Sequence, residues 1–112
     1  MIKKENRLKK GREVGKILSK GSVIKTANLT MRYLISRPTD PARLTVVVSK
    51  KVYAKANKRN YLKRRVREAF ASEITQKHGI LIVAFPRKSA DEISFQLLQQ
   101  EVRTCLEKAP SS

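Results

Sequence analysis

The sequence predicts an α+β sandwich in which helices pack on one face of a sheet. Two runs of apolar and β-branched residues, 44–48 and 80–85, have the length of buried strands. Two other segments, 12–19 and 57–75, repeat apolar residues at the spacing of a helix that is buried on one side. A sheet covered by helices would bury the apolar faces of all four segments. The 112 residues are expected to form a single domain.

The first twenty residues combine a basic arm with a short helix. Residues 1–10 are expected to form an irregular arm that Leu8 anchors. A helix over 12–19 follows, because three apolar side chains share one face there: Val14, Ile17 and Leu18. Gly21 stands where such a helix would end.

The middle of the chain has the pattern of strands. The segment 22–36 could supply one strand, or a strand with an irregular lead. A turn with two prolines follows at 37–41 and leads into the buried strand over 44–48. The last strand, over 80–85, is closed by Pro86.

A helix is expected near the C-terminus. Ser89 and Glu92 have the spacing of a capping box, which predicts the start of this helix. Its apolar face holds Phe95, Leu98, Val102 and Cys105. Residues 109–112 are expected to be a frayed end. The residues alone thus give the order helix, strand, strand, helix, strand, helix.

The most informative segment is 58–67, which carries six positive charges and no negative one. On a helix, two stripes lie side by side along it. The cationic stripe holds Asn60, Lys63, Arg64 and Arg67, and the apolar stripe holds Leu62, Val66, Ala69 and Phe70. Like charges one turn apart repel by a few tenths of a kcal/mol per pair. A chain that accepts this cost is expected to offer the cationic stripe to a polyanion.

The charge of the chain points to nucleic acid. Lys and Arg number 26 against nine Asp and Glu, a net charge of +17. The excess is uneven, because residues 43–70 hold ten basic and one acidic residue, whereas 91–108 hold two basic and four acidic ones. The apolar runs are too short to span a bilayer, and the basic N-terminus lacks the apolar core of a signal peptide. We therefore expect a soluble, cytoplasmic protein.

Residues that could catalyse hydrolysis or hold a metal are scarce. The only histidine, His78, is expected in a surface loop, and the nine carboxylates are scattered. The adjacent pair Asp91 and Glu92 is explained better by a helix N-terminus than by catalysis. Cys105 is alone and is expected to be a buried structural thiol. The polypeptide is therefore expected to bind RNA or DNA without cutting it unaided, and to hold no metal or other cofactor.

Three short blocks resemble the bacterial ribonuclease P protein subunit. They are Arg-Asn-Tyr-Leu-Lys-Arg at 59–64 followed by Arg67, Val-Ser-Lys-Lys at 48–51, and Asn-Arg-Leu-Lys-Lys at 6–10. The resemblance implies the order α-β-β-β-α-β-α, with four strands, three helices and a left-handed β-α-β crossover. It also implies an accessory subunit of an endoribonuclease, bound one to one to a catalytic RNA that uses Mg²⁺ to remove the 5′ leader of precursor tRNA.

The resemblance implies three sets of binding residues. Those facing the RNA subunit are Arg59, Asn60, Lys63, Arg64 and Arg67. Those of a leader cleft between the first helix and the sheet are Val14, Leu18, Tyr33, Val48, Lys50 and Lys51. Those of the N-terminal arm are Arg7, Lys9 and Lys10.

The residues themselves leave some of these roles open. Val14 and Leu18 stand where the family usually carries aromatics, which puts stacking of leader bases on this helix in doubt. Tyr33 could equally be a half-buried strand residue, and Asn60 could cap the helix or brace a loop. Lys50 and Lys51 are expected to end a strand, so that at most one of them faces the cleft.

Two other functions compete with this one. A ribosomal or other structural RNA-binding protein would have a similar charge, and only the three sequence blocks argue against it. A DNA-binding regulator would use 58–72 as a recognition helix, but such a helix usually belongs to a helix-turn-helix. Here strands are predicted on both sides of the helix, which disfavours a regulator.

Overall fold

The computed structural model describes residues 2–9 and 11–109. Its elements are η1 (Lys4–Asn6), α1 (Arg12–Lys20), β1 (Ser22–Lys25), β2 (Leu29–Ile35), β3 (Arg43–Val46), α2 (Ala56–Ile74), β4 (Ile80–Pro86), η2 (Lys88–Asp91) and α3 (Phe95–Lys108), where η marks a 3₁₀ helix. The predicted α+β class and the order α-β-β-β-α-β-α are confirmed. The segment 22–36 supplies two strands, because its first residues form β1 and pair with β2.

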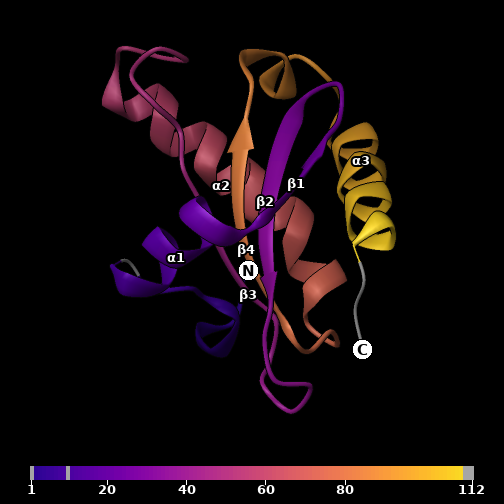
Figure 1. Ribbon diagram of the computed structural model, residues 1–112. Helices are drawn as coiled ribbons and strands as arrows, with labels where there is room; N and C mark the ends of the chain where they lie inside the picture. The colour runs from indigo at the N-terminus through magenta and orange to yellow at the C-terminus, as the bar shows by residue number, and fades with distance from the viewer. Residues whose placement is uncertain (1, 10, 110–112) are drawn as a thin grey trace.

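The four strands form one sheet in the order β1-β2-β4-β3 (Figure 1). β1 and β2 make an antiparallel hairpin, and β4 pairs antiparallel with β2. β3 is parallel to β4, and α2 connects them, which forms the expected β-α-β unit. The hand of this crossover stays a prediction. β4 lies between two neighbours, so that Ile82 is opposite Tyr33 on one side and Leu44 on the other.

Helices cover both faces of the sheet, and the prediction of helices on one face is wrong. In Figure 1, α2 passes behind the sheet, α3 stands beside β1, and α1 crosses in front. Residues of α2 and α3 share one core, and α1 packs in a separate one. The reason is the composition of β4, whose apolar residues point to both sides. Ile82 and Ala84 belong to the core under α2 and α3, whereas Val83 packs with Ile17 of α1.

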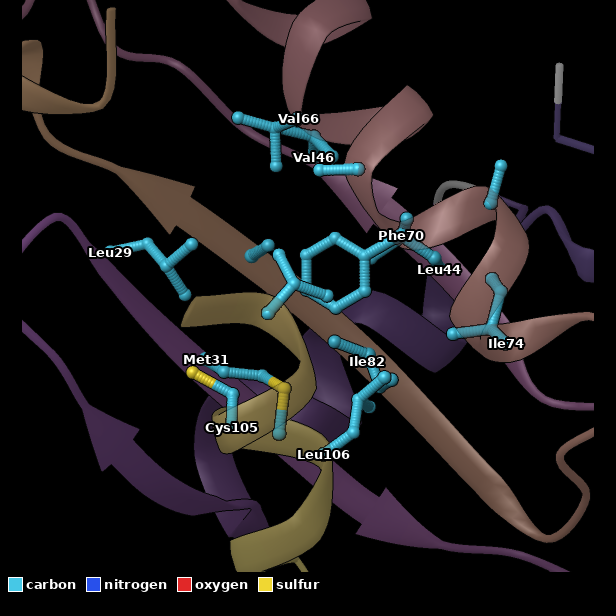
Figure 2. Close-up of a cluster of buried hydrophobic side chains, with 14 of the residues drawn as sticks. Leu29, Met31, Leu44, Val46, Val66, Phe70, Ile74, Ile82, Cys105 and Leu106 are labelled. Atoms are coloured by element: carbon cyan, nitrogen blue, oxygen red, sulfur yellow. The ribbon is translucent and has the colours of Figure 1, made fainter. Parts of the chain in front are cut away.

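The larger core lies between the sheet and the pair α2 and α3. Figure 2 shows Phe70 and Ile74 of α2 beside Leu44 and Ile82, with Cys105 of α3 close to Met31. The whole predicted apolar stripe of α2 is fully buried: Leu62, Val66, Ala69 and Phe70. Burial of one large apolar side chain is worth about 1.5–3 kcal/mol, so this stripe fixes which side of α2 faces solvent.

The N-terminal arm is more ordered than predicted. The backbone of Arg7 makes a parallel bridge to Leu44 on the edge of β3, and the Leu8 amide donates to the Leu44 carbonyl at 2.9 Å. Leu8 is buried, as predicted for the anchor. Two further anchors were not predicted: Ile2 is buried, and buried Asn6 donates from Nδ2 to the Ala42 carbonyl at 2.7 Å.

The start and end of the last helix differ from the prediction. The capping box at Ser89 is wrong, since residues 88–91 form η2 and α3 begins at Phe95. Ser94 is the N-cap, and its hydroxyl accepts from the Leu97 amide at 3.2 Å. Ala109 is buried and ends the helix in an ordered C-cap, so the frayed end does not begin there. Residues 110–112 lie outside the described part.

Polar contacts tie α3 to the β1–β2 hairpin. The Glu101 carboxylate accepts from the amide and side chain of Asn28 at 2.8 and 2.6 Å, and from the Thr26 hydroxyl. Cys105 lies one turn further along and is buried, as predicted. Burial raises the pKa of this thiol, which keeps it protonated.

Candidate nucleic-acid interface

The cationic stripe of α2 lies beside its buried stripe. Asn60 and Arg64 are exposed, whereas Lys63 and Arg67 are half-buried and lean toward the edge of β3. The predicted placement of all four outside the core is therefore confirmed. Their roles in RNA binding stay predictions.

A cationic groove runs between α2 and the edge of β3. Its volume is about 290 Å³, and it is lined by Arg7, Leu8, Lys63, Arg67 and residues 44–47. The bridge between Arg7 and Leu44 holds the arm at one wall of this groove. Three cationic side chains, one from the arm and two from α2, thus meet at one groove, which suits a phosphate backbone.

Two other arginines of α2 brace the protein itself. Arg59 is half-buried and donates to the carbonyls of Tyr53 at 3.0 Å and Ala54 at 2.6 Å. Arg65 donates to the carbonyls of Ala90 and Ile93, which holds the segment before α3 against α2. The loop-bracing role that was considered for Asn60 therefore belongs to Arg59. Asn60 does not cap the helix either, because Lys55 is the N-cap residue.

The loop before α2 departs from the prediction. β3 ends at Val46, and Lys50 and Lys51 lie in a turn whose Ser49 carbonyl accepts from the Val52 amide at 3.1 Å. The prediction that these lysines end a strand is wrong, because the chain leaves the sheet four residues earlier. Both lysines are exposed beyond the C-terminal end of β3.

Tyr53 holds this loop against η2, a contact that was not predicted from the sequence. Its hydroxyl donates to the Asp91 carboxylate at 2.7 Å, and this hydrogen bond raises the pKa of Tyr53. The Lys58 and Lys88 ammonium groups lie 5.6 and 5.4 Å from the centre of its ring. Asp91 is structural, as expected, but through this hydrogen bond and not through a helix N-terminus.

The structure divides the predicted cleft set between the two faces of the sheet. Val14 is half-buried and Leu18 is 41% exposed, both on α1. Tyr33 and Val48 belong to the core under α2 and α3, so their placement in a cleft beside α1 is wrong. Tyr33 follows Leu29 and Met31 at a spacing of two, and alternate strand residues share a face.

Other residues occupy the sheet face that α1 covers. Leu34, Leu81 and Phe85 pack there partly buried against Ile17 and Val83. Arg32 crosses to α1 and donates to the Leu18 carbonyl at 2.9 Å. These residues were not predicted from the sequence, although the period of two that starts from buried Leu29 assigns Leu34 to this face.

The described residues contain no obvious hydrolytic or metal centre. His78 is exposed, and its backbone bridges to Pro41. Within residues 2–9 and 11–109, no group of three His, Cys, Asp or Glu side chains could hold a metal ion. Over the same residues, no helix is long and apolar enough to cross a membrane. Lys9 is exposed on the arm, and Lys10 lies outside the described residues.

Comparison with known proteins decides the family. Residues 2–110 match the family described as Ribonuclease P. The chain belongs to the ribonuclease P protein family. It is 32% identical over 110 residues to the "Ribonuclease P protein component" of Pseudanabaena sp. (strain PCC 6903), covering 97% of this chain and 95% of that one. It is also 32% identical over 111 residues to the protein of the same name from Bacillus pumilus (strain SAFR-032), covering 96% and 91%.

Solved structures agree with this assignment. The ribonuclease P protein from Thermotoga maritima superposes with a TM-score of 0.80 at 28% identity, covering 94% of this chain and 98% of that one. The protein from Staphylococcus aureus gives a TM-score of 0.77 at 26% identity, with 93% and 94% covered.

Membership of the ribonuclease P family establishes the function in outline. The chain is an accessory protein subunit of an endoribonuclease whose catalyst is RNA. It binds RNA and takes part in tRNA processing, with ribonuclease P RNA and precursor tRNA as partners. The alternatives of another structural RNA-binding protein and of a DNA-binding regulator are thereby set aside.

Proposed function

We propose that the cationic groove and the neighbouring stripe of α2 bind the backbone of the ribonuclease P RNA. The observation that carries this proposal is the meeting of Arg7 with Lys63 and Arg67 in one groove. Arg can hold a phosphate by two parallel hydrogen bonds, while Lys acts as a compact charge. A mixture of the two suits a folded backbone better than a code of bases. Arg64 and Asn60 extend the contact along the exposed side of α2.

We further propose that the 5′ leader lies along α1 and the adjoining sheet face. Leu18 gives this surface an exposed aliphatic side chain, and Arg32 a cation near it. Aliphatic side chains do not provide the base stacking of an aromatic side chain, which is worth about 1–3 kcal/mol per base. The leader is therefore held mainly through its backbone, with Lys50 and Lys51 as cations at the end of β3.

The remaining expectations complete this proposal. Mg²⁺ belongs to the RNA-containing holoenzyme, because the catalytic RNA carries the phosphates that bind it. The protein works in the cytoplasm as a single RNA-binding domain, bound one to one to the RNA. Arg7 of the arm contributes to the groove, and Lys9 and Lys10 are expected to add further contacts with the RNA.

Reconstitution tests the proposal. The protein is mixed with a bacterial ribonuclease P RNA and a precursor tRNA at low Mg²⁺, and removal of the 5′ leader is followed on a gel. We expect cleavage that neither the protein nor the RNA gives alone under these conditions. The double variant Lys63→Ala/Arg67→Ala should need a higher protein concentration for the same rate, because it removes both cationic side chains that α2 contributes to the groove.

Lys25→Ala is the matched control, because Lys25 is exposed on β1 at the opposite edge of the sheet. It should behave as the unchanged protein. Equal loss in Lys25→Ala and in the groove variant would contradict a localised interface. Cleavage by purified protein free of RNA would contradict the accessory role.

A further inference from the structure

Two large aromatic side chains lie exposed on the outer side of α2 and α3. Tyr61 is 55% exposed, and Phe95, the first residue of α3, is 38% exposed. Both line one shallow pocket of about 400 Å³, together with Arg64, Arg65 and Glu68. The chain has only six Tyr and Phe residues and no Trp. Two exposed aromatic side chains at one site therefore call for an explanation. Neither takes part in the groove.

Hydrogen bonds brace the two elements that carry the pocket. Arg65 donates to the carbonyls of Ala90 and Ile93, and thereby holds the residues that lead into α3 against α2. The Ser94 cap then starts α3, with Phe95 as its first residue. Two braced elements thus carry the two rings, and a flat ligand that binds there need not order the site first.

We propose that Tyr61 and Phe95 form a platform on which one unpaired base of the ribonuclease P RNA stacks. The proposal rests on the proposed function, since it requires that α2 faces RNA. Arg64 lies one turn from Tyr61 and lines the same pocket, where its charge suits the phosphate of a stacked nucleotide. The Glu68 carboxylate lines the pocket one turn further along, so the phosphate is expected at the Arg64 end.

RNA fits this site better than a second copy of the chain. Every base offers a π-face to an aromatic ring, and proteins that bind unpaired RNA use such stacking widely. A second copy would bring another net charge of +17 to a surface that already carries Arg64 and Arg65. The motif Arg-Asn-x-x-Lys-Arg does not specify this contact, because Tyr61 stands at one of its two x positions.

The platform changes the path that RNA takes around α2. At 3.6 residues per turn, Lys63 and Tyr61 lie about 160° apart around the helix. Asn60 and Arg64 lie between them, so the groove, the cationic stripe and the platform form one continuous surface. RNA would therefore contact a broad surface of α2 that extends from the edge of β3 to α3, and not the cationic stripe alone.

The test compares the affinity of ribonuclease P RNA for Tyr61→Ala, Tyr61→Phe and Phe95→Leu. Tyr61→Ala and Phe95→Leu should weaken binding by about 10-fold to 100-fold, as loss of one base–aromatic contact does. Tyr61→Phe keeps the ring and should bind as the unchanged protein. Leu97→Ala is the control, because Leu97 is 54% exposed on α3 and does not line the pocket. Thermal melting of each variant checks the fold.

The salt dependence separates this proposal from the proposed function. Tyr61→Ala should leave the slope of log affinity against log salt unchanged, whereas Arg67→Ala should reduce it by about one. Unchanged affinity in Tyr61→Ala together with weaker binding in Arg67→Ala would overturn the platform and leave the groove standing. Unchanged affinity in both would overturn the proposed function as well. Sedimentation could instead show a dimer that Tyr61→Ala abolishes while RNA binding stays unchanged. This result would identify a second copy of the chain as the occupant and overturn the platform.

Discussion

Arg64 and Arg65 are neighbours on α2, yet their guanidinium groups have different surroundings. Arg64 is exposed, whereas Arg65 binds two backbone carbonyls. We expect Arg64→Ala to weaken RNA binding and to shift the free energy of unfolding by no more than about 0.5 kcal/mol, the usual range for a surface change. Arg67→Ala should also weaken binding with little loss of stability. Filter binding and thermal melting check the two quantities separately.

Arg65→Ala is the contrasting variant. Hydrogen bonds from a charged donor are worth about 1.5–3 kcal/mol, and the freed carbonyls of Ala90 and Ile93 lose their partner. We expect the melting temperature to fall by about 5 °C or more. If Arg64→Ala lowers the melting temperature as much as Arg65→Ala does, the assignment of the two sides of α2 is wrong.

Glu101 should make stability depend on pH at the acid end. Partial burial alone would raise the pKa of Glu101, but the hydrogen bonds from Thr26 and Asn28 outweigh it and lower this pKa below the usual value. A carboxylate with a depressed pKa in the folded state stabilises fully above its unfolded pKa of about 4.3 and loses that contribution as pH falls through the folded pKa. We expect melting curves between about pH 5 and pH 2 to show this loss.

Glu101→Gln removes the charge and should flatten that part of the pH profile. Glu107→Gln is the matched control, because Glu107 is exposed on the same helix. An identical acid profile for the unchanged protein and Glu101→Gln would contradict the assigned role.

Single residues show where sequence reasoning succeeded and where it failed. The spacing of Lys63 and Arg67 along one helix was enough to place both outside the core. Arg7 could not be placed beside them, because only the bridge between the arm and Leu44 brings it there. Tyr33 was assigned to the wrong sheet face, since a slip of one residue along a strand exchanges the two faces.

At the scale of elements, Ser94 and Ser89 give a direct test of where α3 begins. The Ser94 hydroxyl accepts from the Leu97 amide, which would otherwise lack a partner in the first turn. We expect Ser94→Ala to destabilise the protein by about 1 kcal/mol, the usual cost of losing an N-cap. Ser89→Ala should change stability much less, because Ser89 lies in η2. Chemical unfolding of both variants measures the difference, and a larger loss in Ser89→Ala would restore the predicted capping box.

Elements with a strong internal pattern were predicted well. The helix expected over 57–75 is observed as α2 (Ala56–Ile74), and the strand over 80–85 as β4 (Ile80–Pro86). Elements that depend on distant partners were predicted less well. β1 is short and largely exposed, and its pairing with β2 makes it a strand. The position of α1 was not predicted, because α1 packs on the second apolar face of β4. A continuous apolar run in the sequence does not show which helix covers each face of the strand.

At the scale of the whole molecule, the positive charge is concentrated where the fold brings α2, the arm and β3 together. The arm reaches the edge of β3, and the parallel crossover places α2 along the same edge. α3, which follows in the acidic stretch 91–108, uses Glu101 to hold the β1–β2 hairpin. The fold thus gathers cations at the groove that we propose for RNA binding, while Glu101 of the acidic stretch has a structural role.

This distribution predicts a steep dependence of RNA affinity on salt. Each phosphate that a cation neutralises releases counterions, so six to ten contacts would cost roughly 10³–10⁵ in affinity between about 50 and 200 mM salt, with duplex DNA as the upper guide. The triple variant Arg7→Ala/Lys63→Ala/Arg67→Ala should lower the slope of log affinity against log salt by about two to three, because three groove cations are lost. Lys25→Ala, at the far edge of the sheet, should leave it nearly unchanged. Titrations of ribonuclease P RNA at several salt concentrations measure the slope. An affinity that stays flat over this range would mean that contacts other than phosphate pairs hold the RNA, and the groove would then lose its assigned role.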